Sequence, residues 1–213
     1  MHLPDGVLDT KIWATLDAVS AGTVAYAIRQ TTKHSEEKMI PMMGVMAAFI
    51  FAAQLMNVPT PGGPPVHLVG AVLAAVLLGP WPATVVMAAV LAVQSFLMQD
   101  GGLLALGANI FNIGVIGTLG GYLIFLAVRK IFKGDRGIIA GTFAAAWLST
   151  IVSTGAVALQ MIVSGASPAE LVLPVLGGLN LIVGAIEGLI TATIIGFVLK
   201  VRRDMVYGAV HAS

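Results

Sequence analysis

Apolar segments of helical length, separated by short charged ones, constrain this chain more than any other feature. A helix needs about 20 mostly apolar residues to cross the hydrocarbon core of a bilayer. Seven segments approach this pattern, at residues 12–28, 39–56, 66–78, 82–98, 108–128, 138–163 and 168–199. Only 10% of the 213 residues are charged, whereas soluble domains carry roughly 25%. We therefore predict an all-α, polytopic integral membrane helical bundle of about seven transmembrane helices, forming one substrate-binding domain over residues 1–213.

Two of these segments are not expected to be simple crossings. Segment 66–78 is too short to cross a core of about 30 Å at about 1.5 Å per residue. We expect it to start below the membrane surface or to form half of a re-entrant pair with the next segment, which leaves seven or five crossings open. In the last segment, Pro174 with Gly177 and Gly178 predicts a bend or a break of the helix.

The basic residues predict the orientation of the chain. Ten of the eleven Lys and Arg residues fall in three places: 29–38, 129–136 and 200–203. The positive-inside rule makes these places cytoplasmic. We therefore expect a multi-pass protein of the cell (cytoplasmic) membrane, with its amino terminus outside and its carboxyl terminus in the cytoplasm.

Several kinds of chemistry have no matching motif in the sequence. There are no cysteines, which removes disulfides and thiolate metal ligands. The chain has no G-x-x-x-x-G-K-[ST], H-E-x-x-H or G-x-S-x-G pattern. We therefore expect no ATP site in this chain, no enzymatic activity and no nucleic-acid partner, so that energy for any active transport has to come from another subunit.

The predicted topology separates the four histidines. His34 lies in a cytoplasmic loop and His211 in the carboxyl-terminal tail, and both are expected to be solvated. His2 and His67 both lie on the outer side. A turn at Leu3–Gly6, with Pro at its second position and Gly at its fourth, is typical of type I and could fold His2 back toward the bundle.

Met1, His2 and His67 are the candidate metal ligands. The α-amine of Met1, the backbone nitrogen of His2 and the nearer imidazole nitrogen of His2 can form two fused chelate rings in one plane. The imidazole of His67 would complete a square of four nitrogens, which suits Ni(II) or Cu(II) better than Zn(II). Residues 1–10 contain no Lys or Arg, so we expect no signal peptide and expect Met1 to be the mature start. The alternatives are an ordinary polar terminus for His2 and a helix cap for His67.

Other polar residues near the outer ends of the segments could support such a site. Metal-bound imidazoles usually donate their second nitrogen to a polar group. The candidates for this role are Asn57, Gln94, Ser95, Asn109 and Asn112.

Asp17 and Glu187 lie inside apolar segments, where an ionisable group is costly. They allow two other interpretations. The chain could be a gated cation or proton channel that uses these two residues, or the two residues could have a purely structural role in helix contacts. A membrane enzyme is a third reading.

Three stretches carry a resemblance to a known family: MHLPDGVL, GGPPVHLVGAVLAAVLLGPWPA and VQSFLMQDGGLLALGANIFNIGVIG. They resemble the membrane-embedded substrate-capture (S) component of energy-coupling-factor nickel and cobalt transporters, the NikM/CbiM family, and look more like its nickel members. The specific similarity runs from Met1 to about Gly121, and the span pattern continues to about Lys200.

The resemblance implies high-affinity capture of Ni(II), or alternatively Co(II), as a transported substrate from outside the cell. It assigns the metal to Met1, His2 and His67. It also implies a transmembrane T component and an ATPase pair as partners, and leaves room for a small additional membrane subunit.

Overall fold

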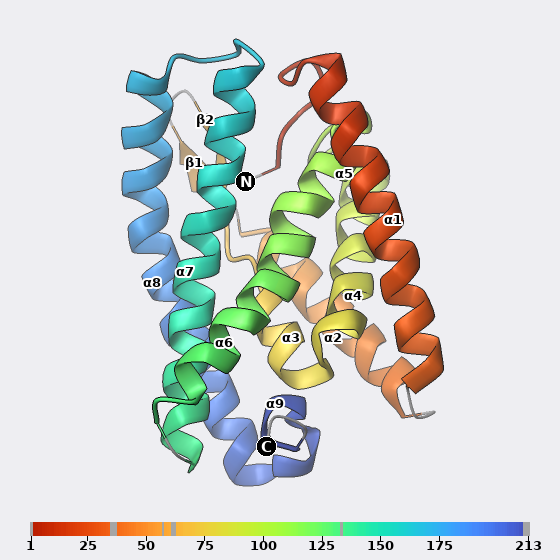
Figure 1. The fold of residues 1–213 in the computed structure, drawn as a ribbon, viewed down its shortest axis with the longest axis vertical. Coiled ribbons are helices and arrows are strands. Elements are labelled where there is room, and N and C mark those ends of the chain that lie inside the picture. Colours follow the sequence, from red (N-terminus) through yellow and green to blue (C-terminus); the bar gives the residue numbers. More distant parts are fainter. Residues whose placement is uncertain (1, 35–37, 57, 61–62, 133, 211–213) are drawn as a thin grey trace.

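The structure is a computed structural model that describes residues 2–34, 38–56, 58–60, 63–132 and 134–210. Long helices run roughly along one axis and enclose a shorter one, as Figure 1 shows. The helices are α1 (Thr10–His34), α2 (Met39–Gln54), α3 (Ala71–Leu78), α4 (Pro80–Val93), α5 (Leu106–Asn109), α6 (Gly121–Arg129), α7 (Gly134–Val163), α8 (Ala169–Val201) and α9 (Tyr207–Val210). The π-helical turns η1 (Gln94–Met98) and η2 (Ile110–Gly120) extend α4 and α5, and a 3-10 turn, η3 (Arg203–Met205), precedes α9.

The predicted helical bundle is confirmed, and four helical stretches within the described residues are long and apolar enough to cross a membrane. They are Pro80–Met98, Leu106–Arg129, Gly134–Val163 and Ala169–Val201. The helix α2 is apolar but shorter, at 16 residues. Because α3 has eight residues, it spans only about 12 Å and cannot cross alone. The count of seven crossings stays a prediction.

The helix α3 forms the buried centre of the bundle. All of its residues except Leu77 are buried, and they pack with residues from α4, η2, α6 and α8 in one apolar core. Gly70 and Gly79 flank the helix with φ of 74° and 91°, a left-handed backbone region that favours glycine. The turn at Gly79 lets α4 start at once with Pro80, whose missing N–H is tolerated in a first helical turn.

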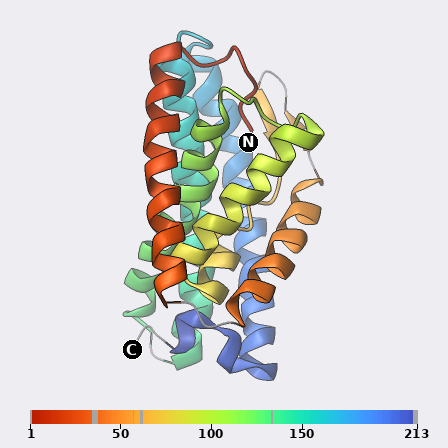
Figure 2. The same ribbon diagram turned by 90° about the vertical axis from the view of Figure 1, so that its right-hand side faces the viewer.

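A short antiparallel hairpin interrupts the helices before α3. Strands β1 (Val58–Thr60) and β2 (Gly63–Val66) pair with each other. Figure 2 shows α2 rising only part of the way along the bundle, with the hairpin above its end. The chain then descends to α3, so the third segment starts part of the way along the bundle, which agrees with the first of the two expectations for it.

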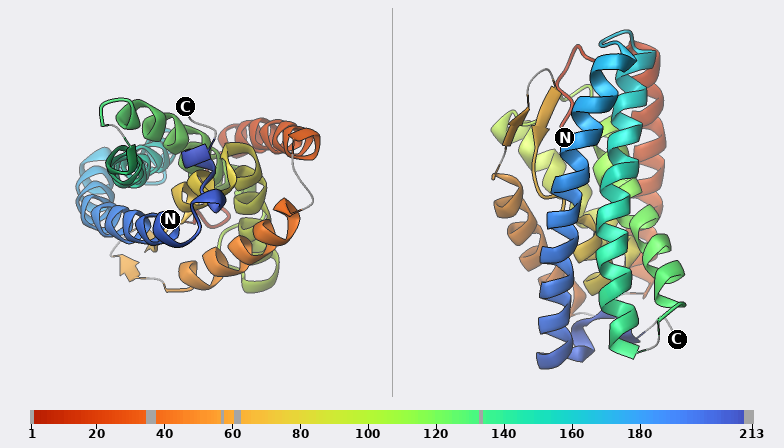
Figure 3. Two further views of the ribbon diagram at one scale, coloured as in Figure 1. Left: turned by 90° about the horizontal axis from the view of Figure 1, so that it is seen from below. Right: turned by 90° about the vertical axis from the view of Figure 1, so that its left-hand side faces the viewer.

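The expected break in the last segment is absent. The helix α8 continues through Pro174 to Val201, and it lies beside α7 along its length (Figure 3). Pro174 is the sixth residue of the helix, so its missing N–H removes only one interior hydrogen bond. Close packing on α7 supports the helix further along: a Cβ on Gly184 would lie 3.1 Å from Trp147, and a Cβ on Gly188 would lie 2.9 Å from the carbonyl oxygen of Phe143.

The basic segments gather at one end of the molecule. The ends of α1, α6 and α8, which carry these segments, lie at the lower end in Figure 1, together with α9. The amino-terminal segment enters the bundle in its upper half. This arrangement agrees with the orientation predicted from charge, which itself stays a prediction.

Candidate metal centre

The amino-terminal segment folds back into the bundle. His2 and Leu3 are buried, with 3% and 0% of their surface exposed. The backbone N–H of Leu3 donates to Oδ1 of Asn109 at 2.8 Å, and Nδ2 of Asn109 donates to the carbonyl oxygen of Leu3 at 3.0 Å. The N–H of Gly102 donates to the same carbonyl oxygen at 2.9 Å. Both the N–H and the carbonyl oxygen of Leu3 are thus hydrogen-bonded, as in a β-strand, although their partners are the side chain of Asn109 and the backbone of Gly102.

A turn at Asp5 and Gly6 redirects the chain from this buried position to α1. Gly6 has a φ of 84°, so the turn is centred on Asp5 and Gly6, one residue later than the type I turn predicted at Leu3–Gly6. Gly6 is the third residue of this turn, and its positive φ is the one that a type II turn needs at that position and that glycine adopts most readily.

The Asp5 carboxylate fixes this turn to the start of α5. It accepts the backbone N–H groups of Leu103, Leu104 and Ala105 at 3.0, 2.8 and 3.1 Å. On α1, Asp17 accepts the N–H of Gly107 at 2.7 Å. Carboxylates bound to the free N–H groups of a helix start are favourable, and together these two tie the amino-terminal segment and α1 to residues 100–109.

His2 and His67 lie side by side. Their ring centroids are 4.6 Å apart with planes at 39°, and His67 is 3% exposed. His67 reaches this position from the segment between β2 and α3. The structure thus brings together two of the predicted ligands, while Met1 lies outside the described residues, as do His211 and the side chain of His34.

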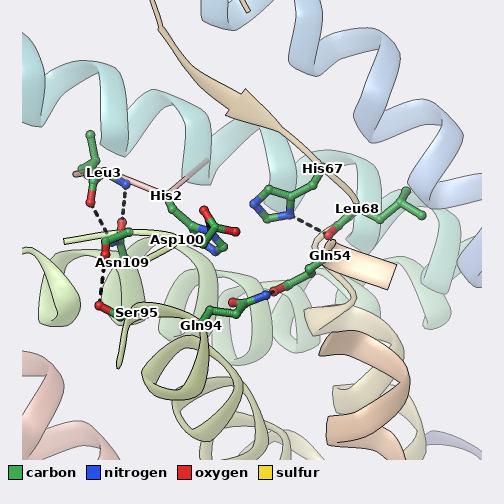
Figure 4. Close-up of polar contacts among 10 residues, drawn as sticks. His2, Leu3, Gln54, His67, Leu68, Gln94, Ser95, Asp100 and Asn109 are labelled. Carbon is green, nitrogen blue, oxygen red and sulfur yellow. Dashed lines mark hydrogen bonds and ion pairs between the residues drawn. The ribbon is translucent and has the colours of Figure 1, made fainter. Parts of the chain in front are cut away.

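The contacts of the two rings define which nitrogens can bind a ligand. Nδ1 of His67 lies 2.8 Å from the carbonyl oxygen of Leu68, so Nδ1 carries the proton and Nε2 has a lone pair. Nδ1 of His2 lies 2.9 Å from Oδ1 of Asp100. Both Nε2 atoms are buried and have no hydrogen-bond partner among the described residues. Figure 4 shows the two rings and these contacts.

Burial also sets the protonation of His2. Loss of solvent lowers the pKa of His2 below its ordinary value, although the neighbouring Asp100 acts in the opposite direction. The neutral imidazole, which is the form that binds metals, is therefore the favoured one at neutral pH.

The predicted supporting residues bind other parts of the site instead of the rings. Asn109 holds Leu3, as described above, and Ser95 donates to the carbonyl oxygen of Gly101 at 3.1 Å. Asn112 exchanges two hydrogen bonds, of 2.8 and 2.7 Å, with Gln160 of α7. Asn57 lies outside the described residues.

Gln94 belongs to a chain of buried amides that ends at the His67 segment. It donates to Oε1 of Gln54 at 3.0 Å, and Nε2 of Gln54 donates to the carbonyl oxygen of Val69 at 2.6 Å. Sequence reasoning missed Gln54 because an amide at the end of an apolar helix, such as α2, is common and gives no sign of a buried contact. It also missed Asp100, whose position in a loop gave no sign of a contact with His2.

Glu187 supports the His67 segment from the other side. Oε1 accepts the N–H of Gly70 at 2.8 Å, and Oε2 accepts from Oγ1 of Thr150 at 3.2 Å. A small cavity of about 40 Å³ lies beside Glu187, Gln54 and Leu68. Both carboxylates that the sequence singled out within apolar segments, Asp17 and Glu187, thus bind the backbone of segments that carry the candidate site.

The chain resembles proteins of metal transport throughout its length. Residues 2–205 match the family model described as the cobalt uptake substrate-specific transmembrane region. A metal transport protein of Haloquadratum walsbyi is 37% identical over 97% of this chain and 94% of its own length. A fused nickel transport protein of Archaeoglobus fulgidus is 33% identical over 97% of this chain and 68% of its own length. The crystal structure of a truncated transition metal transporter, 29% identical, superposes with a TM-score of 0.82 over 94% of this chain and 99% of that one.

Proposed function

Because the chain belongs to the CbiM family, whose members are membrane components of cobalt and nickel uptake and not enzymes, we propose that it captures Ni(II) from outside the cell. In this proposal it is the substrate-specific S component of an energy-coupling-factor ABC-type transporter in the cell membrane. A transmembrane T component and an ATPase pair drive release into the cytoplasm. The chain itself has no P-loop motif, which is why the energy has to come from such partners.

The observation that carries the proposal is the pair of buried imidazoles next to the amino terminus. His2 and His67 place two rings 4.6 Å apart. Nε2 of His67, the nitrogen that would bind the metal, is buried and has no partner among the described residues. The described residues hold no group of three or more His, Asp and Glu side chains arranged to bind a metal. A four-ligand site there would thus draw on main-chain nitrogens, which the Met1 and His2 chelate supplies.

The proposed coordination uses the α-amine of Met1, the backbone and imidazole nitrogens of His2, and the imidazole of His67. The nearer imidazole nitrogen of His2, Nδ1, contacts Asp100 in the structure, so the metal would replace that contact. Four nitrogens in a plane favour Ni(II) over metals that prefer a tetrahedron. Co(II) is the alternative substrate, since the matching family is described by cobalt uptake.

The test is to place one residue before Met1 and to measure Ni(II) binding by the purified chain. Changes around a metal ligand typically cost about 10- to 100-fold in affinity, so losing the amine should cost at least about 100-fold. The control adds the same residue after Ser213 and should leave the affinity unchanged. If the amino-terminal extension binds Ni(II) as well as the unmodified chain, the chelate proposal is wrong. Mass spectrometry of the expressed protein shows whether Met1 is its first residue.

The channel reading remains the alternative from a different class. It would use Asp17 and Glu187 as ion-binding groups in the membrane. Their hydrogen bonds to Gly107 and Gly70 favour a role in supporting the metal centre instead. Ion flux through liposomes that contain the purified chain distinguishes the two readings.

A further inference from the structure

Asp100 contacts the candidate metal centre and is rigidly placed there. Its Oδ1 lies 2.9 Å from Nδ1 of His2, and its side chain is 20% exposed. Its backbone N–H donates to the carbonyl oxygen of Gln94 at 3.1 Å. The next residue, Gly101, has a φ of 96°, and a Cβ there would lie 3.0 Å from Nδ2 of Asn109 and 3.3 Å from Cβ of His2. The backbone of this loop therefore has little freedom to move away from the site.

The proposed metal complex carries a net positive charge. A divalent ion brings two positive charges, and the deprotonated backbone nitrogen of His2 removes one. The amine and both imidazoles are neutral ligands, so the complex keeps one positive charge. His2 and His67 are both about 3% exposed, and a buried charge is costly unless an opposite charge accompanies it. The Asp100 carboxylate has the required charge, and its electrostatic influence reaches both imidazoles.

We propose that Asp100 is the counter-charge of the bound metal. Before the metal binds, its carboxylate holds the ring of His2 through Nδ1. Once the metal has taken Nδ1, the same carboxylate neutralises the single positive charge that a divalent ion keeps in the four-nitrogen site. Asp100 is a positioning residue and not a ligand. The inference rests on the proposed function, because the charge count assumes the Met1 and His2 chelate.

Two substitutions separate charge from shape. Asp100→Asn keeps the size of the side chain and an oxygen that can accept from His2, but removes the charge. Asp100→Glu keeps the charge and changes the shape. We expect Asp100→Asn to weaken Ni(II) binding by at least about 10-fold, in the range of residues that support metal ligands, and Asp100→Glu to stay closer to the original affinity. A role in packing alone predicts the reverse order.

The binding titrations are made on the purified chain with its native amino terminus, and the absorption spectrum of the nickel complex is recorded at saturation. Asp9→Asn is the matched control, because Asp9 is exposed and caps the first turn of α1 by accepting the N–H of Lys11, a role that Asn also fills. It should bind Ni(II) within two-fold of the original chain. The nickel spectrum should not change in Asp100→Asn, because the four nitrogens remain.

Three outcomes would overturn the inference. If Asp100→Asn binds Ni(II) as tightly as the original chain, Asp100 is not the counter-charge. If the nickel spectrum of Asp100→Asn is shifted, Asp100 is a metal ligand. A loss in Asp100→Glu as large as that in Asp100→Asn makes the role steric. The amino-terminal extension described above tests the proposed function separately, so failure of the chelate and failure of the Asp100 assignment give different results.

Discussion

At the scale of single residues, Gly102 shows how closely the amino-terminal segment fits against residues 100–109. A Cβ at this position would overlap with the carboxylate and the backbone nitrogen of Asp5. The same glycine donates its N–H to the carbonyl oxygen of Leu3. The segment that carries His2 therefore has no room for any larger residue at position 102.

We expect Gly102→Ala to weaken Ni(II) binding by moving this segment. Overpacking of a tight contact costs about 1–3 kcal/mol, which corresponds to roughly 5- to 150-fold in affinity. Gly22→Ala in α1 is the matched control, because a Cβ there meets no atom within 4 Å. Titration of the two purified variants measures the difference. Equal affinities would mean that the packing of Asp5 on Gly102 does not hold the metal ligands in place.

The pH dependence of binding follows from the ligand atoms. Burial lowers the pKa of His2, so this ring is mostly neutral at neutral pH and contributes little to the protons released on binding. The backbone nitrogen of His2 releases one proton, and the α-amine releases another below its ordinary pKa of about 7.7–8.0. The affinity for Ni(II) should therefore decrease as the pH is lowered. Each pH unit should cost about 10-fold at pH values above the pKa of the amine, and about 100-fold at pH values below it. Titrations between pH 6 and 9 measure these slopes, and a pH-independent affinity would exclude the amide ligand.

At the scale of elements, the sequence predicts the helices well and their interruptions poorly. The sixth segment, predicted at 138–163, is α7 at Gly134–Val163, because apolar runs bounded by charges mark membrane helices directly. The π-helical turns of η1 and η2 leave no comparable signal. Four prolines in 57–65 restrict the backbone of this connection, but the pairing of β1 with β2 is a contact between backbones that side-chain patterns do not specify.

Glu187 links two elements, since it joins α8 to the segment that carries His67. We expect Glu187→Leu to weaken Ni(II) binding, because the partly buried N–H of Gly70 loses its acceptor at a cost of about 1–3 kcal/mol, or roughly 5- to 150-fold in affinity. Glu187→Gln keeps an acceptor oxygen and should have the smaller effect. Glu170→Gln, at the exposed start of α8, is the control. A proton or cation flux in liposomes that disappears in Glu187→Gln would instead support the channel reading.

At the scale of the whole molecule, the candidate site is assembled from segments far apart in the sequence. Leu3 and Asn109 are 106 residues apart and exchange two hydrogen bonds. Sequence reasoning could place His2 and His67 on one side of the membrane from charge and spacing. It could not find Asp100, because a carboxylate in a polar loop is ordinary until the fold brings His2 against it. Long-range contacts of this kind depend on the packing of α4, α5 and α1, which local patterns do not determine.

The orientation of the whole bundle leads to a last prediction. The chain has no cysteine, so single cysteines can be introduced and labelled without background. Ala166 lies in the exposed connection between α7 and α8, and Asp204, whose side chain is 66% exposed, lies in η3 just after α8. The α7–α8 connection and the carboxyl-terminal end of α8 are at opposite ends of the bundle (Figure 1). If the basic segments face the cytoplasm, a membrane-impermeant maleimide should label Ala166→Cys in intact cells and Asp204→Cys only after permeabilisation. The opposite pattern would place His2 and His67 on the cytoplasmic half and would rule out capture of the metal from outside.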